Sequence, residues 1–209
     1  MRLLYLHGFR SSPQSAKAQI MAARVAKAQA NGVEIEWHCP QLPPSPSEAF
    51  EMIWQWASLP LLGNPKAVQP PLAIMGSSLG GFYAAALTER LLRVGVYARC
   101  VLLNPAVHPA RDLAAFIGRV KNWHASDDKW GGFEFTQQHV QELRAIETED
   151  FSRPERYMAV IAKGDELLDW REMVSRYPAK SMLLLARGDH ALTGFEKFAD
   201  RALKFCRDK

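Results

Sequence analysis

Short apolar runs alternate with longer amphipathic stretches along most of the chain. The apolar runs end at glycine, proline or asparagine, which is typical of buried strands, whereas the longer stretches are rich in good helix formers. The pattern predicts strands at residues 3–6, 33–37, 72–75, 97–103, 156–162 and 181–186. It predicts helices at residues 15–30, 46–58 and 79–92, and a last helix from residue 193. Strands that alternate with helices indicate a mostly parallel sheet of about six strands with helices on both faces.

Local signals predict where three of these helices begin or end. The Asn-Gly pair at residues 31–32 is typical of a helix C-terminus. Ser45 is followed by a proline and, three residues after it, by Glu48, which predicts a capping box at the start of the second helix. Thr193 and Glu196 have the same spacing and predict a capping box for the last helix.

Residues 105–153 interrupt the alternation. They contain helix-like pieces near residues 111–118 and 136–146, and we interpret them as a helical lid insertion before the strand at 156–162. A second core layer over the sheet is an equally supported interpretation. The insertion carries four aromatic residues that we expect in a lid or in the wall of an acyl pocket: Trp123, Trp130, Phe133 and Phe135.

Composition places the chain among ordinary globular proteins. Its 209 residues suit a single domain, 1–209, with one sizeable core. Hydrophobic residues make up 48% and charged residues 23%. The formal charge is +4, but the basic residues are scattered, as in the pairs Arg24 and Lys27 or Arg90 and Arg93. Without a basic stripe, we expect a mildly basic surface and no nucleic-acid partner.

The three cysteines, Cys39, Cys100 and Cys206, are an odd number without metal-type spacing, so we expect free thiols in a reducing compartment. The apolar run at the N-terminus is too short for a signal-peptide core. No apolar stretch approaches the length of a membrane span. These features predict a cytoplasmic protein.

The segment Gly76-Ser77-Ser78-Leu79-Gly80 fits the G-x-S-x-G spacing and lies between a predicted strand and a predicted helix. In this motif the central serine occupies a sharp turn that projects its hydroxyl into the site. The spacing selects Ser78, because Ser77 lacks glycine two residues away on either side. The alternative is a glycine-rich turn with two capping serines.

Asp165 and His190 each follow a later predicted strand. The order Ser78, Asp165, His190 is the order of the α/β-hydrolase version of the catalytic triad, in which the histidine activates the serine and the carboxylate orients the histidine. Asp169 and Asp189 are alternative acids, although Asp169 lies further from its strand and Asp189 is adjacent to His190. His190 is selected because it combines a late position, a strand end and the turn residues Gly188-Asp189. The other histidines do not combine these features, namely His7, His38, His108, His124 and His139.

An acyl transfer also needs donors for the developing oxyanion. We predict that these are the backbone N–H groups of Leu79, the residue after the serine, and of Phe9, where Gly8 lets the loop bend. The alternative is that this glycine merely ends the first strand. Side chains that we expect to contact the substrate are those of Phe9, Leu167 and Leu192.

Six segments between residues 3 and 196 resemble those of the small bacterial YqiA/YcfP-type esterases of the α/β-hydrolase superfamily. They are "LLYLHGFRSSPQSAKA", "PQLPPSPSEA", "IMGSSLGGFYA", "NPAV", "GDELLDWRE" and "GDHALTGFE". The resemblance implies the α/β-hydrolase fold without the leading strands of larger relatives. It implies that Ser78 is the nucleophile, Asp165 the orienting acid and His190 the general base. Arg10 and the long segment 108–153 depart from the family pattern near the expected substrate entrance.

Together these features predict a serine carboxylesterase that cleaves small-molecule acyl esters through an acyl-enzyme on Ser78. A thioesterase acting on acyl-CoA or other thioesters with the same triad is an alternative, and a non-catalytic binding protein of the same fold is a second. A nucleotide-binding loop is disfavoured, because no lysine follows the glycines. We expect no metal and no cofactor, since neither His-x-His nor HExxH occurs.

Overall fold

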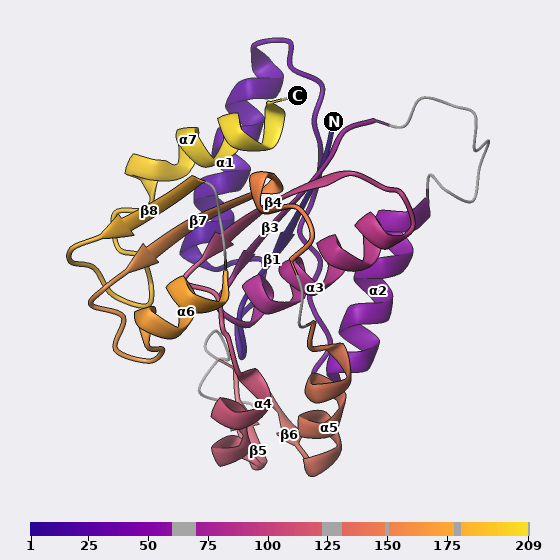
Figure 1. The fold of residues 1–209 in the computed structure, drawn as a ribbon, viewed down its shortest axis with the longest axis vertical. Coiled ribbons are helices and arrows are strands. Elements are labelled where there is room, and N and C mark those ends of the chain that lie inside the picture. Colours follow the sequence, from indigo (N-terminus) through magenta and orange to yellow (C-terminus); the bar gives the residue numbers. More distant parts are fainter. Residues whose placement is uncertain (60–69, 123–130, 149–150, 178–180, 209) are drawn as a thin grey trace.

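The computed structural model of the chain describes residues 1–59, 70–122, 131–148, 151–177 and 181–208 (Figure 1). Its main sheet has the strand order β2-β1-β3-β4-β7-β8, and all neighbouring strands are parallel. The strands are β1 (Arg2–Leu6), β2 (Glu36–His38), β3 (Leu72–Ser77), β4 (Ala98–Leu103), β7 (Tyr157–Ala162) and β8 (Ser181–Leu185). Because the strands are parallel, the loops that follow them gather at one edge of the sheet.

Each face of the sheet carries its own hydrophobic cluster, because alternate strand residues point to opposite sides. Leu4 and Leu6 of β1 pack on one side, and Leu3 and Tyr5 pack on the other. The first cluster is covered by α2 (Pro46–Ser58), α3 (Leu79–Arg93) and α6 (Trp170–Arg176). The second is covered by α1 (Ala16–Ala30) and α7 (Glu196–Arg207), which lie together on the opposite side in Figure 1. Burial on both faces explains why the strands are apolar runs without polar alternation.

The second strand is shorter than the sequence predicts. The prediction covered residues 33–37, whereas β2 comprises Glu36–His38. The N–H of Val33 donates to Ala28 O and that of Gly32 to Gln29 O, and Gly32 has a φ of 81°. This pattern is a Schellman motif, so Val33 completes the end of α1 instead of starting a strand.

The caps of α2 and α7 have opposite outcomes. At α2 the serine half of the predicted capping box forms, because the Ser45 hydroxyl oxygen accepts the N–H of Glu48 at 3.3 Å. At α7 the prediction is wrong, and the helix begins at Glu196. The hydroxyl and the N–H of Thr193 both donate to the carboxylate of Asp189, so Thr193 belongs to the preceding loop.

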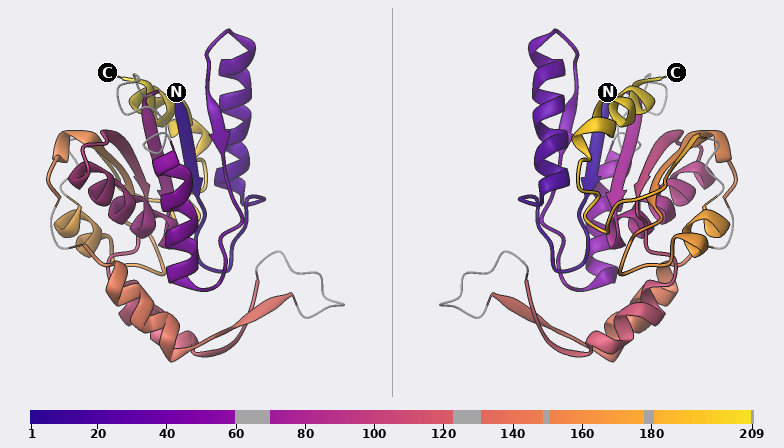
Figure 2. Two further views of the ribbon diagram at one scale, coloured as in Figure 1. Left: turned by 90° about the vertical axis from the view of Figure 1, so that its right-hand side faces the viewer. Right: turned by 90° about the vertical axis from the view of Figure 1, so that its left-hand side faces the viewer.

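The insertion contains two strands that the pattern did not predict. It comprises α4 (Pro109–Asp112), a 3₁₀ turn (Leu113–Phe116), β5 (Gly118–Lys121), β6 (Gly132–Phe135) and α5 (Gln137–Ile146). β5 and β6 pair antiparallel and are only four residues long, which is too short for a clear alternation. Figure 2 shows the insertion beyond the carboxyl edge of the sheet. Phe135 belongs to the core cluster and Phe133 packs against it, whereas Trp123 and Trp130 lie outside the described residues.

A short 3₁₀ turn (Pro154–Arg156) leads from the insertion into β7. Across the described segments, every helix is too short or too polar to cross a bilayer.

Candidate active site

Ser78 occupies a strained turn between β3 and α3. Its φ of 56° and ψ of −123° lie in a region that residues with a Cβ rarely adopt. The surrounding backbone holds the turn, since the Ser78 N–H donates to Leu103 O and the Ala106 N–H donates to Ser78 O, both at 3.0 Å. The end of β4 therefore fixes the conformation of Ser78.

The glycines around Ser78 are required by close backbone contacts. A Cβ on Gly76 would lie 2.0 Å from the carbonyl oxygen of Gly80, and a Cβ on Gly80 would lie 2.1 Å from that of Leu6. A Cβ on Gly8 would lie 3.1 Å from the Cβ of Ser78. The ends of β1 and β3 and the start of α3 therefore meet without room for side chains.

Asp165 and His190 are brought together at the same edge of the sheet. The Nδ1 atom of His190 lies 2.8 Å from Oδ2 of Asp165, whose side chain is fully buried. The other carboxylate oxygen accepts the N–H groups of Leu167 and Leu168, both at 2.9 Å. With Nδ1 donating to a carboxylate, Nε2 of the neutral imidazole is free to accept a proton.

Two further side chains hold the loop that carries His190. Asn104 is fully buried, and its amide nitrogen donates to Asp189 O at 3.0 Å while its amide oxygen accepts the Ala162 N–H at 2.8 Å. The ammonium of Lys17 donates to Ala191 O at 2.8 Å. The sequence pattern identifies Asn104 only as the residue that follows the strand at 97–103. It gives one weak sign of a further role, because asparagine tolerates the left-handed conformation that Asn104 adopts here, with a φ of 41°.

The two alternative acids make other contacts. Asp169 caps α6, because its Oδ1 accepts the N–H of Arg171 at 2.9 Å. Asp189 accepts the N–H and the hydroxyl of Thr193, and these bonds lower the pKa of Asp189. Of the three carboxylates, Asp165 is the one that bonds the ring of His190 within the described residues.

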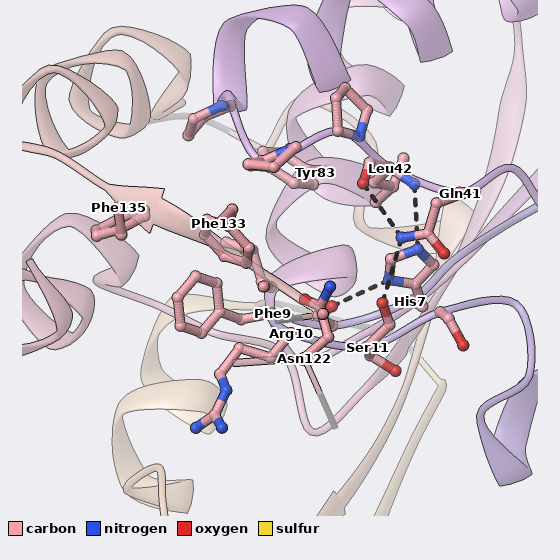
Figure 3. Close-up of a pocket in the computed structure, with 18 of the residues that line it drawn as sticks. His7, Phe9, Arg10, Ser11, Gln41, Leu42, Tyr83, Asn122, Phe133 and Phe135 are labelled. Carbon is pink, nitrogen blue, oxygen red and sulfur yellow. Dashed lines mark hydrogen bonds between the residues drawn. The ribbon is translucent and has the colours of Figure 1, made fainter. Parts of the chain in front are cut away.

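Two cavities flank the loop after β1. The smaller, which we call the Ser78–His190 cavity, has a volume of about 250 Å³ and is also lined by Ser11, Ser15 and Lys17. The larger, which we call the aromatic cavity, has a volume of about 560 Å³ (Figure 3). Its wall includes Phe9, Leu42, Leu79, Tyr83, Phe133 and Phe135. Phe9 lines both cavities, and Leu79 lines the aromatic one.

The side chain of His7 orients the peptide between Gly8 and Phe9. Its Nε2 atom lies 3.1 Å from the N–H of Leu42 and must accept that hydrogen, so Nδ1 carries the proton and donates to Gly8 O at 3.0 Å (Figure 3). Because the peptide is trans, the N–H of Phe9 points away from this bond. The N–H of Leu79, the first residue of α3, has no acceptor within its own helix. Sequence reasoning had assigned the side chain of His7 no role.

Comparison with known protein families assigns the chain to one of them. The sequence model of the Uncharacterised protein family (UPF0227) matches residues 2–207. The chain belongs to this family.

Solved structures identify the fold of this UPF0227 member. One is a structure described as LipS and LipT, two metagenome-derived lipolytic enzymes, and its sequence is 16% identical to this chain. The match covers 99% of this chain and 93% of the other chain, with a TM-score of 0.67. Est1E from Butyrivibrio proteoclasticus with ferulic acid bound is 13% identical, with coverages of 100% and 90% and a TM-score of 0.67. Mouse alpha/beta hydrolase domain-containing protein 10 is 12% identical, with coverages of 97% and 89% and a TM-score of 0.61. The predicted α/β-hydrolase fold is confirmed.

The expected substrate contacts have different surroundings in the UPF0227 chain. Phe9 lines both cavities, but Leu167 and Leu192 line neither. Leu167 is 64% exposed, whereas Leu192 is buried in the cluster beneath α1 and α7. The packing of Leu192 gives it a place in the core, and contact of Leu167 with a substrate stays a prediction.

The cysteines are free thiols in this structure. Burial raises the pKa of Cys39 to about 11 and that of Cys206 to about 12, and it raises the pKa of Cys100 further. None of the three is therefore a thiolate near neutral pH. Among the described residues, His, Cys, Asp and Glu side chains form no group of three or more that could hold a metal ion.

Proposed function

We propose that this protein is a serine hydrolase that cleaves acyl esters through an acyl-enzyme on Ser78. The observation that supports this most strongly is the strained turn of Ser78 beside a cavity shared with His190, whose Nδ1 is bonded to the buried carboxylate of Asp165. A backbone conformation of this kind costs about 1–3 kcal/mol. Such strain clusters at functional sites and therefore supports a catalytic role for Ser78.

In the proposed reaction Ser78 Oγ attacks the ester carbonyl while His190 Nε2 takes its proton. Asp165 keeps the imidazole in the required tautomer and stabilises the imidazolium. The N–H groups of Phe9 and Leu79 stabilise the oxyanion. His190 then protonates the leaving alcohol as the C–O bond breaks, and a water molecule activated by His190 releases the acid from Ser78.

A thioester would react by the same steps, with a thiol as the leaving group. We favour oxygen esters because two structural neighbours are described as lipolytic enzymes and as Est1E with ferulic acid bound. These neighbours are only 13–16% identical, so their names serve as support for the reaction class and not for a substrate.

A fluorophosphonate probe tests the nucleophile. Wild type is expected to be labelled and to hydrolyse p-nitrophenyl esters with a higher kcat/KM than acyl-CoA thioesters. Ser78→Ala is expected to lose both labelling and hydrolysis, with a fall in kcat of about 10⁴-fold or more. Ser77→Ala is the matched control, since Ser77 is the adjacent buried serine and is expected to leave the probe on Ser78.

Circular dichroism of each variant excludes unfolding as the cause of a loss. Absence of labelling in folded wild type would favour the binding protein. Labelling that persists in Ser78→Ala would mean that another residue is the nucleophile.

A further inference from the structure

The two cavities that flank the loop after β1 differ in size, and Ser78 lines only the smaller one. They share four residues of the loop after β1, namely His7, Gly8, Phe9 and Ser11. The aromatic cavity has more than twice the volume of the Ser78–His190 cavity. Both walls carry polar groups, which include Lys17 in the smaller cavity and Gln41 and Asn122 in the larger one. A hydrolase substrate also has two unequal parts, the acyl group and the leaving group, so each cavity has a candidate occupant.

The reaction geometry decides which part goes where. In the tetrahedral adduct on Ser78, the leaving oxygen has to reach His190, which protonates it. Of the two cavities, His190 lines the smaller one. With the leaving group in the Ser78–His190 cavity and the oxyanion at the N–H groups of Phe9 and Leu79, the acyl chain is the remaining substituent. The aromatic cavity, which shares Gly8 and Phe9 with the smaller one, is the space left for it.

Gly8 lies where the two cavities meet, since it lines both. A Cβ on Gly8 would lie 3.6 Å from Ser78 Oγ, so a side chain at this position would crowd the nucleophile. Tyr83 lies four residues after Leu79 on α3 and therefore on the same helix face, about 6 Å further along the axis. An acyl chain whose carbonyl oxygen lies at the N–H of Leu79 can extend along this face toward Tyr83.

One side of the aromatic cavity is built from phenylalanine rings and suits an uncharged apolar chain, whereas Gln41 and Asn122 are polar residues of the same wall. The ring of Phe9 makes edge-to-face contacts with Phe133 and Phe135, with centroids 5.7 and 5.3 Å apart. Arg10 is the one formally charged residue among the described residues of the wall, and its Nε donates to Lys121 O. His7 accepts a backbone N–H through Nε2 and is therefore neutral.

We infer that the aromatic cavity holds the acyl group and that the leaving group departs through the Ser78–His190 cavity, so that the substrates are esters of an apolar acid longer than acetate with a small alcohol. This inference rests on the proposed serine hydrolysis. It assigns the two ends of the substrate, which the triad alone does not do.

Two isomeric esters test the inference in the unmodified protein. Ethyl hexanoate and hexyl acetate contain the same atoms, but the first places four additional methylenes on the acyl side. Burial of a methylene contributes about 0.8 kcal/mol, which is about fourfold in kcat/KM. After division by the rates of alkaline hydrolysis, ethyl hexanoate is expected to have the higher kcat/KM by about tenfold or more.

A cavity-filling variant provides the second arm. Met52→Trp enlarges a residue that lines the aromatic cavity and is 38% exposed, and it is expected to lower the ratio of kcat/KM for ethyl hexanoate to that for ethyl acetate by about fivefold or more. Val94→Trp is the control, because Val94 is 53% exposed, lies at the far end of α3 and lines neither cavity. It is expected to leave the ratio unchanged.

The outcomes separate this inference from the proposed function. A preference for hexyl acetate, equal values for the two isomers, or an unchanged ratio in folded Met52→Trp would overturn the inference and leave serine hydrolysis intact. Hydrolysis that survives Ser78→Ala, or no hydrolysis of any ester by wild type, would overturn the proposed function itself.

Discussion

The loops at the carboxyl edge of the sheet and the insertion beyond them line the same site. The two regions are held in place by different kinds of contact. Around Ser78, hydrogen bonds join the backbone to a neighbouring strand end, since the Ser78 N–H donates to Leu103 O and the Ala106 N–H donates to Ser78 O, both at 3.0 Å. The insertion reaches the site through side-chain rings on Phe9, and its residues Phe116 and Ile117 are 42% and 47% exposed. Rigid backbone contacts therefore hold the reacting groups, whereas exchangeable side chains shape the space for the substrate. Variants in the loops should change the rate for every ester, and variants in the insertion should change the choice among esters.

The acid of the triad offers the largest test of this contrast. Asp165→Asn leaves an amide beside His190 Nδ1 and is expected to lower kcat by about 10⁴-fold for all esters, since an amide favours the wrong imidazole tautomer. Asp169→Asn is the matched control, because asparagine caps a helix as well as aspartate and should change stability by less than about 0.5 kcal/mol. The measurement is kcat for a p-nitrophenyl ester series. Full activity in Asp165→Asn together with loss in Asp169→Asn would identify Asp169 as the acid.

Two glycines allow the same collision to be introduced into each region. A Cβ on Gly80 would lie 2.1 Å from Leu6 O, and a Cβ on Gly132 would lie 2.1 Å from Val120 O in the β5–β6 pair. Gly80→Ala has to displace the loop of Phe9 or the start of α3, so we expect a fall in kcat of about 10²-fold and a stability loss of about 3 kcal/mol.

Gly132→Ala disturbs only the β5–β6 pair, whose strands have four residues each and lie at the periphery of the fold (Figure 2). We expect it to cost about 1 kcal/mol or less and to change the ratio of long to short acyl esters more than kcat. Chemical denaturation and the ester series measure both effects. Equal losses of kcat in Gly80→Ala and Gly132→Ala would show that the insertion also holds the reacting groups.

The same contrast separates what the sequence could predict from what it could not. The positions of Ser78, Asp165 and His190 after their strands followed from local rules, because apolar runs, turn residues and glycine spacing act within a few residues. Whether these side chains perform the proposed reaction is a matter for the experiments above. The contact between Asp165 and His190 could be anticipated because parallel strands bring their following loops to one edge.

The missed features depend on partners distant in sequence. Asn104 bonds a loop 85 residues further along the chain, and His7 bonds Leu42 in another loop. The strands β5 and β6 are too short to show a period and find each other only in the folded chain. Thr193 looks like a cap until the carboxylate of Asp189 accepts both of its donors. In each case a tertiary hydrogen bond or packing contact outweighs the local signal.

Asn104 is the tie between the loops after β4 and β8, and its removal should act on rate more than on substrate choice. Asn104→Gly removes both amide hydrogen bonds and tolerates the φ of 41°, whereas Asn104→Ala adds backbone strain of about 1 kcal/mol. We expect both to lower kcat by about 10–100-fold with little change in KM, since a shifted His190 misaligns the proton transfer. The ratio of ethyl hexanoate to ethyl acetate is expected to stay constant. A change in that ratio without a fall in kcat would place Asn104 with the substrate-selecting residues instead.

Lys17 also holds the loop that carries His190, and its contribution to the stability of the fold should depend on pH. Burial lowers the pKa of Lys17 to about 8 from 10.5, although the nearby carboxylates of Asp165, Asp189 and Glu166 oppose the shift. Below pH 8 both the folded and the unfolded chain carry this proton, and the folded chain bears the full desolvation penalty. Between pH 8 and 10.5 the unfolded chain binds more protons, so the stability of the wild type should rise with pH relative to Lys17→Met.

The rise should amount to at most about 3 kcal/mol, measured as the difference between the free energies of unfolding of the two proteins at pH 7 and at pH 10. Subtraction of the variant removes the titration of all other groups. Lys17→Arg provides the control, because arginine stays charged over this range and should show no rise. If the difference in free energy of unfolding between wild type and Lys17→Met does not change with pH, the ammonium of Lys17 stays hydrated in the folded protein. The hydrogen bonds from Lys17 to the His190 loop would then contribute little to holding this edge of the sheet in place.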